Sequence, residues 1–248
     1  MLLTHHIKYS KIAIDKLNID RLEREQVMIG AKVNDLCEWT NEYQFFFPNK
    51  QEIQDIMSSR KELVFLEDRA IYQSHFGNLT SLHAMSKKPD EPASITKNEL
   101  VEWFEFLNDV ALGNKTIASK NKIVSDSVQI SNMFTGETIK YRQIFDADDT
   151  FRIKYRALGM MLHLIQDAYT FSHCERDEKN KVVQFYSYKK QNKEKHTEGD
   201  DVQDAEKDTL LKQCKSCLEN ILNGNRYHYD QILSLSSNPQ NSGGGIFV

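Results

Sequence analysis

Apolar residues recur every three to four positions along most of the chain, which is the spacing of α-helices rather than of strands. The clearest example is the segment 96–113, where Leu100 and Phe104 belong to one continuous apolar face. Thr96 stands where a helix N-cap is favoured, and Gly113 follows the last periodic residue, as a helix-ending glycine often does. The pattern therefore predicts a helix over this segment.

The same periodicity predicts helices along the rest of the chain. They are expected at roughly 7–18, 20–33, 50–58, 61–74, 150–173, 201–224 and 226–235. Only four prolines and ten glycines interrupt the 248 residues, which also favours helices. We therefore predict an all-α fold, with a single helical bundle domain over residues 1–235 and a flexible C-terminal tail over residues 236–248.

The charge and hydropathy of the chain argue against some classes of partner. A formal net charge of −4 speaks against bulk electrostatic binding of nucleic acid. No apolar run approaches the roughly 18 residues that a membrane-spanning helix needs. The sequence starts MLLTHHIKYSK, without the apolar segment of a signal peptide. We expect a cytoplasmic protein, or one exported without a cleavable signal peptide, including delivery into another cell.

Four cysteines are too few for a disulfide scaffold in a chain of this length. Cys214 and Cys217 form a CxxC pair, but no second pair exists that would complete a four-thiolate zinc site. We expect both cysteines as ordinary, partly buried residues on one face of a helix.

The stretch HLIQDAYTFSH, residues 163–173, concentrates metal-type ligands in an apolar segment. On a helix, His163 and Asp167 lie four residues apart and therefore share one face. A carboxylate among apolar residues is unfavourable unless a counter-charge compensates it. Imidazole and carboxylate are common zinc ligands, so a metal ion would supply that charge. A buried His–Asp hydrogen bond is the structural alternative.

A second His–Asp pair with the same spacing follows, formed by His196 and Asp200. With His173, the two pairs offer five ligands, which is more than the four that one zinc ion takes. The sequence therefore predicts more than one metal ion. Further candidate ligands come earlier in the chain: His5, His6, Asp35 and His75. The remaining histidines, His83 and His228, are expected as surface or core residues.

The order of these residues resembles the zinc-dependent phospholipase C and single-strand nuclease superfamily, whose members are all-helical enzymes with three zinc ions. The most specific part is 163–200, where His-x-x-x-Asp, a further His and a second His-x-x-x-Asp follow one another. The segments RALGMMLHLIQD and IGAKVND are similar to glycine-containing segments of that family, with Asn34 in place of the usual proline. The resemblance implies the same single-domain helical fold and hydrolysis of phosphodiesters by a metal-bound water.

The resemblance also implies which residues bind the metal. One zinc ion would be held by Asp35, His75, His163 and Asp167, and a second by His173, His196 and Asp200. A third would share Asp167 and bind His5 or His6. In the family, the amino group of an N-terminal tryptophan completes this third site, where the present chain has Met1. Two or three zinc ions are therefore expected.

The implied substrate is a phosphodiester. Asp35 would orient the attacking water or take its proton. Tyr72 and Phe76 fall where family members place aromatic residues that contact the substrate. A phospholipid is preferred over single-stranded nucleic acid because the chain is acidic, with peripheral membrane contact from loops such as EYQFFFPNK. A single-strand nuclease or nucleotidase of the same fold, or a non-catalytic zinc-binding member, is the alternative.

Overall fold

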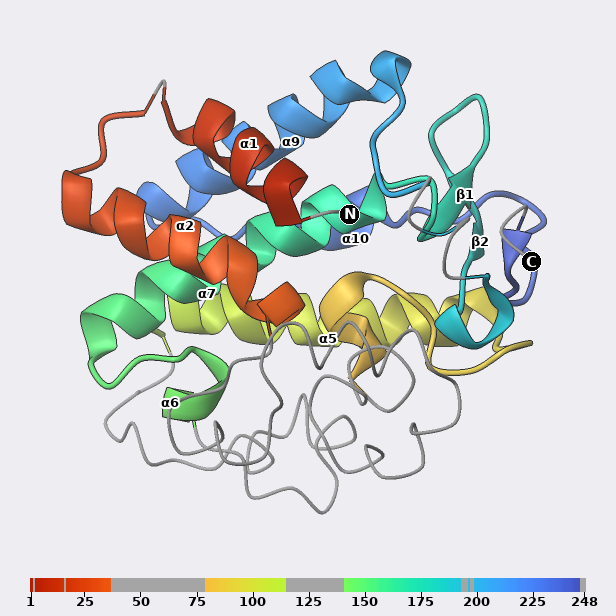
Figure 1. The fold of residues 1–248 in the computed structure, drawn as a ribbon, viewed down its shortest axis with the longest axis horizontal. Coiled ribbons are helices and arrows are strands. Elements are labelled where there is room, and N and C mark those ends of the chain that lie inside the picture. Colours follow the sequence, from red (N-terminus) through yellow and green to blue (C-terminus); the bar gives the residue numbers. More distant parts are fainter. Residues whose placement is uncertain are drawn as a thin grey trace.

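The computed structural model describes residues 1, 3–15, 17–36, 79–114, 141–192, 196 and 199–245. This part of the chain is mostly helical, as predicted (Figure 1). The longer helices are α1 (Leu3–Ile14), α2 (Arg21–Leu36), α5 (Ala93–Ala111), α7 (Thr150–Ala168) and α9 (Asp204–Leu222). The shorter ones are η2 (Thr80–His83), α6 (Tyr141–Ile144), η4 (Tyr188–Lys190) and α10 (Tyr229–Ile232).

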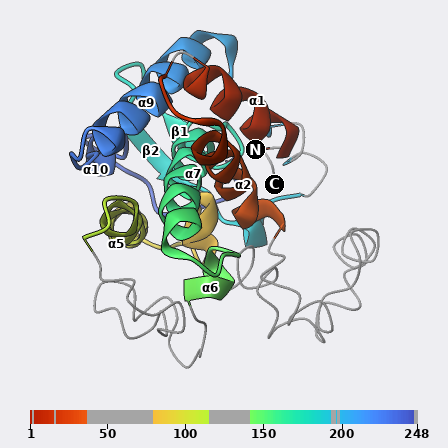
Figure 2. The ribbon, with the colours of Figure 1, turned by 90° about the vertical axis from the view of Figure 1, so that its left-hand side faces the viewer.

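Helix α7 lies in the middle of the bundle, and α2, α5 and α9 pack around it (Figure 2). Every residue of α7 from Tyr155 to Ala168 is buried. A helix that is apolar on nearly all sides belongs in a core, which explains this central position. Because His163, Gln166 and Asp167 belong to the buried stretch, their polar groups need partners from neighbouring elements.

Two glycines allow the backbones of α2 and α7 to approach each other closely. A Cβ atom at Gly30 would lie 2.1 Å from the carbonyl oxygen of Arg156, and one at Gly159 would lie 2.1 Å from that of Val27. No side chain fits at such distances, so the crossing requires glycine at both positions. The crossing places the C-terminal end of α2 beside the buried half of α7.

Local hydrogen bonds fix where α2 and α7 begin. Asp20 Oδ1 accepts from the backbone N–H of Glu23 at 2.8 Å, and Glu23 Oε2 accepts from the N–H of Asp20 at 3.1 Å. This reciprocal pair is a capping box. At the start of α7, Asp149 Oδ1 accepts from the N–H of Arg152 at 2.8 Å.

Helix α7 ends at Ala168, whereas the periodicity extended it to about residue 173. The backbone N–H of Thr170 donates to the carbonyl of Asp167, and the Thr170 hydroxyl donates to the carbonyl of Gln166. These bonds close the last turn, so His173 lies outside the helix. One of these bonds comes from the backbone and the other from a single hydroxyl, so neither changes the spacing of apolar residues.

A small antiparallel sheet follows, which the helical periodicity did not predict. Strand β1 (Cys174–Arg176) pairs with β2 (Val182–Phe185), and Cys174 lies opposite Phe185. Three to four residues are too few to show an alternating pattern, which is why these strands were missed.

The described part of the predicted C-terminal tail runs along β2. The N–H of Ser236 donates to the carbonyl of Val182 at 2.9 Å. Gly244 allows the backbone of this segment to approach that of Lys190, since a Cβ at Gly244 would lie 2.4 Å from the carbonyl oxygen of Lys190. Backbone hydrogen bonds from Ser236, Gln240 and Gly243 to the carbonyls of Val182, Val183 and Phe185 join this segment to β2.

Helix α5 begins three residues before the predicted N-cap. Pro92 is the N-cap and Ala93 the first helical residue. Thr96 lies inside the helix, where its hydroxyl donates to Glu91 Oε2 at 2.7 Å. Gly113 follows the helix with a φ of +72°, a conformation that favours glycine and matches the predicted stop.

The helices predicted at 50–58 and 61–74 lie outside the described residues. Among the helices that the structure does describe, none is long and apolar enough to cross a membrane.

Candidate metal centre

A first cluster of ligand atoms forms where α7 meets the ends of α2 and η2. His163 Nε2 lies 3.0 Å from Asp167 Oδ2, one turn further along α7. His83 Nδ1 lies 3.3 Å from His163 Nε2 and 3.5 Å from Asp167 Oδ2. Asp35 Oδ1 completes the group at 3.8 Å from His83 Nδ1 and 3.9 Å from His163 Nε2.

A side-chain hydrogen bond holds His83 in this first cluster. Asn34 Nδ2 donates to the carbonyl of Leu82 at 2.7 Å. The bond ties the last turn of α2 to η2, and both Asn34 and Leu82 are buried. Asn34 therefore fixes the backbone next to His83, a role that the sequence alone did not predict.

A second cluster lies on the other side of Asp167. His6 Nε2 is 3.2 Å from Asp167 Oδ1, and the amino group of Met1 is 3.0 Å from the same oxygen. Asp35 Oδ2 faces His6 Nε2 at 3.8 Å. The imidazoles of His6 and His163 stack with ring centroids 3.8 Å apart. Asp167 thus presents one oxygen to each of two clusters, and Asp35 does the same at longer range.

A third cluster consists of His173, His196 and Asp200. Asp200 Oδ1 lies 3.6 Å from His173 Nε2 and 3.3 Å from His196 Nε2. The amino group of Met1 joins this cluster to the second one, at 3.2 Å from His173 Nε2 and 3.3 Å from Asp200 Oδ1. Figure 1 shows the N-terminus beside the C-terminal end of α7, where all three clusters meet.

Four of these histidines are held by an oxygen atom at the ring nitrogen that faces away from the clusters. The pairs are His163 Nδ1 with Ala31 O (3.1 Å), His173 Nδ1 with His83 O (2.6 Å), His6 Nδ1 with Gln166 Oε1 (2.6 Å) and His196 Nδ1 with Gln191 Oε1 (2.6 Å). Metal-binding histidines are usually oriented in this way, since the bond at one nitrogen fixes the proton there and leaves the other nitrogen as the ligand.

The hydrogen bonds of Gln191 settle the tautomer of His196. A carbonyl oxygen can only accept, so the Gln191 group that lies 2.7 Å from Ser172 O must be its NH₂. The Gln191 oxygen then faces His196, whose Nδ1 must carry the proton. His196 Nε2 consequently points its lone pair at the carboxylate of Asp200, and a cation between the two relieves that repulsion.

The donor atoms fit a metal ion. Within the described part of the chain, three buried ligand atoms have no hydrogen-bond partner: His6 Nε2, Asp35 Oδ2 and Asp167 Oδ2. Buried polar atoms without a partner are rare, and a bound ion satisfies them. Bonds of 2.0–2.1 Å to a tetrahedral zinc ion place the ligand atoms about 3.3 Å apart, close to the separations found here. Three overlapping groups of ligand atoms are close enough together to hold a metal ion: His6, His163 and Asp167; Asp35, His83 and His163; and His173, His196 and Asp200.

The protonation states also suit metal binding. Burial alone would raise the pKa of Asp167, but His173 and the Met1 ammonium hold that pKa well below its usual range. Burial lowers the pKa of His196 to about 3, although Asp200 acts in the opposite direction. At neutral pH this carboxylate is ionised and this imidazole is neutral, and these are the forms that bind metals.

The structure brings together seven of the nine predicted ligands: His6, Asp35, His163, Asp167, His173, His196 and Asp200. His5 lies at the edge instead, where its half-buried ring is 3.6 Å from Asp201 Oδ1. His75 and the two predicted substrate-contacting residues, Tyr72 and Phe76, lie outside the described residues.

Sequence reasoning missed His83, which we expected as an ordinary surface or core residue. The sequence does contain a sign of its role, since His83 stands among the apolar residues Leu79, Leu82, Ala84 and Met85. The structure shows that all four are buried. A histidine in so apolar a segment needs a polar partner inside the protein. Its position matches no motif of the family that the sequence resembles, so the resemblance predicts no role for it.

Tyr188, another residue not predicted, lies at the edge of the centre. Its half-buried ring is 4.7 Å from that of His196, 6.1 Å from His173 and 6.3 Å from His83, measured between centroids. An aromatic ring in this place can contact a molecule that approaches the clusters.

Comparisons of the chain with protein-family models, with curated proteins and with solved structures found no match. The site and its geometry are therefore the basis for a functional assignment.

Proposed function

We propose that this protein is a zinc-dependent phosphodiesterase that acts on phospholipids in the manner of a phospholipase C. One observation carries the proposal: four of the five histidines in three adjoining clusters are held at Nδ1 by oxygen atoms and turn Nε2 toward Asp167 or Asp200, and the fifth, His83, turns Nδ1 toward Asp167. Such an array needs cations, and clustered zinc ions serve phosphodiester hydrolysis. The fold type that we propose is the helical bundle of the phospholipase C and single-strand nuclease superfamily.

The three clusters would hold two or three zinc ions. The first set of ligands is Asp35, His83, His163 and Asp167, the second is Asp167, His6 and the Met1 amino group, which would have to release a proton to bind, and the third is His173, His196 and Asp200. His83 takes the role that the sequence suggested for His75. Asp167 would be shared, since each of its oxygens faces a different cluster.

Zinc bound at these positions would lower the pKa of a water molecule toward about 7 and neutralise the negative charge of the phosphodiester. Asp35 is the carboxylate best placed to handle the proton. Its side chain is 17% exposed, more than that of any other carboxylate in the three clusters, and its Oδ2 has no hydrogen-bond partner among the described residues. Asp35 would orient the attacking water or accept its proton, and Tyr188 would contact the substrate as it approaches.

The charges near the centre favour a phospholipid over a polynucleotide. Among the described residues, the ion pairs of the clusters join carboxylates with histidines and the Met1 ammonium, and none involves Lys or Arg. Proteins that bind nucleic acids follow the phosphate backbone with Lys and Arg. A single-strand nuclease is therefore the second candidate, and the first test includes its substrate.

The decisive experiment measures zinc per chain by plasma mass spectrometry and turnover of fluorescent phospholipids and of single-stranded DNA by the same preparation. We expect two or three zinc ions and cleavage of the lipid. Asp167→Asn should lose at least one zinc ion and the activity, since it removes the shared carboxylate. Asp148→Asn is the matched control, because Asp148 is exposed and lies far from the clusters at the start of α7.

Each alternative has its own signature in this experiment. Cleavage of DNA but not of lipid assigns the nuclease. Zinc without turnover of either substrate indicates a protein that uses the metal for structure or binding. Full zinc content and activity in Asp167→Asn would contradict the proposed centre.

A further inference from the structure

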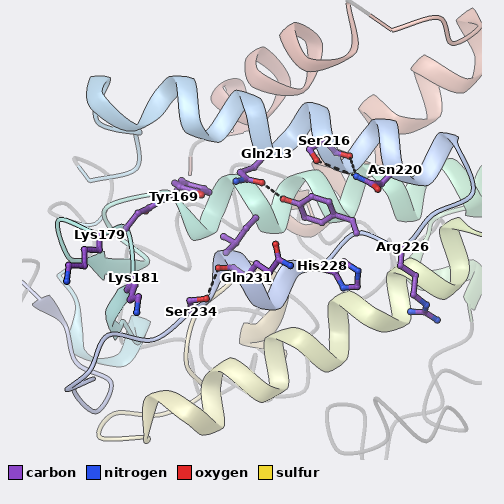
Figure 3. A pocket seen from close by; sticks show the side chains of 13 residues that line it. Tyr169, Lys179, Lys181, Gln213, Ser216, Asn220, Arg226, His228, Gln231 and Ser234 are labelled. Carbon is purple, nitrogen blue, oxygen red and sulfur yellow. Dashed lines mark hydrogen bonds between the residues drawn. The ribbon is translucent and has the colours of Figure 1, made fainter.

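A polar pocket lies on a part of the molecule that contributes no ligand to the metal centre. It has a volume of about 380 Å³, within the range of small-molecule sites. Its walls come from the C-terminal end of α7, the turn between β1 and β2, the middle of α9, and the segment around α10 (Figure 3). Tyr169, which follows α7, is the lining residue nearest in sequence to a proposed ligand.

The pocket is positively charged although the chain as a whole is acidic. Lys179 and Lys181 line one end and Arg226 lies at the opposite end (Figure 3). None of the described residues that line the pocket is an Asp or a Glu. Arg226 is neutralised by ion pairs with Glu105 and Asp109 on α5. No described carboxylate forms an ion pair with either lysine, although Asp177 and Glu178 belong to the same turn, so the two lysine side chains are the cations open to a ligand.

Arg176 braces this end of the pocket from below. Its guanidinium donates to the carbonyl of Asn180 at 2.9 Å and to that of Ile232 at 2.9 Å, and so joins two of the walls. It also lies 4.6 Å from the centre of the Tyr169 ring. Within the described chain its hydrogen bonds go to carbonyl and amide oxygens, and its charge is partly balanced by the carboxylate of Glu206, which interacts with it electrostatically. A rigid wall that carries positive side chains is preorganised for an anion, which lowers the entropic cost of binding.

The lysine-bearing turn is itself fixed by its backbone. Asp177 Oδ1 accepts from the N–H groups of Lys179 and Lys181, each at 2.9 Å. These bonds use the main chain and leave the lysine side chains available to a ligand. Substitution of the two side chains therefore leaves the turn intact.

The α9 wall offers both donors and acceptors. Gln213 Oε1 accepts from the Tyr227 hydroxyl at 2.7 Å, which leaves the Gln213 NH₂ as a donor. Asn220 Nδ2 donates to Ser216 O at 2.8 Å, which leaves the Asn220 oxygen as an acceptor. Gln231 adds a further amide from α10 on the facing wall (Figure 3). Hydroxyl groups both donate and accept, so a polyhydroxylated molecule matches this mixture.

We propose that this pocket is a second binding site, independent of the metal centre, for a phosphorylated polyol. The phosphomonoester lies between Lys179 and Lys181, and the hydroxyl groups lie along Gln213, Asn220 and Gln231. The same chemistry is presented by a soluble polyol phosphate and by the head group of a phosphoinositide lipid, and the test below separates the two.

The test is calorimetric titration of the zinc-loaded full chain with myo-inositol 1-phosphate, with unphosphorylated myo-inositol for comparison. A parallel arm uses phosphatidylcholine vesicles with and without a phosphoinositide that carries one phosphomonoester. The variant Lys179→Ala/Lys181→Ala should weaken binding about tenfold or more, because each exposed charge pair contributes up to roughly fivefold. Lys179→Arg/Lys181→Arg keeps the charge and should keep the binding.

A control pair separates the pocket from general charge and from phosphate bound at the metal centre. Lys8→Ala/Lys97→Ala removes the same charge from α1 and α5, outside the pocket, and should leave the affinity unchanged. Binding to either probe that the Lys179→Ala/Lys181→Ala variant loses supports the site, and the probe that binds identifies soluble or lipid ligand. Equal affinity of wild type and Lys179→Ala/Lys181→Ala, or no binding of either phosphorylated probe stronger than about 10 mM, overturns the proposal.

Discussion

Removal of one glutamine side chain should weaken metal binding, although glutamine is not among the proposed ligands. Gln191 Oε1 accepts from His196 Nδ1 at 2.6 Å, and Gln191 Nε2 donates to Ser172 O at 2.7 Å. The hydroxyl of Ser172 in turn donates to Asp200 Oδ1 at 2.5 Å. Gln191→Leu removes the acceptor that fixes the tautomer of His196 and releases the backbone next to His173. All three ligands of the third cluster therefore lose support.

The expected magnitude follows from this geometry. Loss of an outer partner of a metal-binding histidine lowers the affinity for the metal by about 10- to 100-fold, or roughly 1.4–2.7 kcal/mol. Because Gln191 supports His196 directly and Asp200 through Ser172, we expect the upper part of that range for the ion in the third cluster. The affinity can be measured by competition for zinc with a chromophoric chelator.

Two further variants make this result specific. Gln191→Glu keeps an oxygen acceptor for His196 and should retain zinc affinity within about threefold, since only the donor to Ser172 is lost. Gln184→Leu removes a comparable side-chain bond, from Gln184 Nε2 to Asn241 O at 2.6 Å, away from the clusters. The reasoning is refuted if Gln191→Leu binds every zinc ion as the wild type does, or if Gln184→Leu weakens zinc binding equally.

Three other predictions address the packing, the substrate and the metal-free protein. Gly30→Ala places a methyl group against the carbonyl of Arg156 and should lower the free energy of unfolding by about 3 kcal/mol, measured by urea denaturation. Lys215→Ala, on the exposed face of α9, is the control and should change the free energy of unfolding little. Tyr188→Ala should raise KM several-fold with little change in kcat, while Tyr188→Phe should behave as the wild type; a fall in kcat alone would exclude a role in substrate contact. Folding lowers the pKa of His196 to about 3, so the unfolded chain binds more protons between that value and about 6.5. The free energy of unfolding of chelator-treated protein should therefore decrease as the pH falls through this window, by up to ~1.4 kcal/mol per pH unit from this group. Urea midpoints between pH 7 and 5 test this, and His196→Gln should show a smaller dependence.

The parts of the fold and site that could be predicted are those encoded by spacing along the chain. The pair His163 and Asp167 share a helix face because four residues make about one turn, and the structure places them 3.0 Å apart. The helical character of the segment around Leu100 and Phe104 follows from its apolar period in the same way, and both residues are fully buried in α5.

The parts that could not be predicted depend on contacts between distant segments. His83 enters the first cluster because Asn34, 48 positions earlier in the chain, binds the backbone beside it. The position of His6 depends on Gln166 in the same way, through a bond across 160 positions. Neither contact has a local signature, so no period or motif distinguishes His83 from His75, or His6 from His5.

The order in which the chain is made has a consequence for such a centre. The proposed side-chain ligands run from His6 to Asp200, and the early group, up to His83, meets the late group, from His163 on, through Asp167, His163 and the Met1 amino group. During synthesis, His6 leaves the ribosome long before the residues that complete the clusters do. Metal binding at the proposed centre would therefore be completed in the last stage of folding, after α7 has docked between its neighbours. Zinc content in the finished protein would then report that the whole domain has closed, and a chain cut short before residue 200 would lack the third cluster.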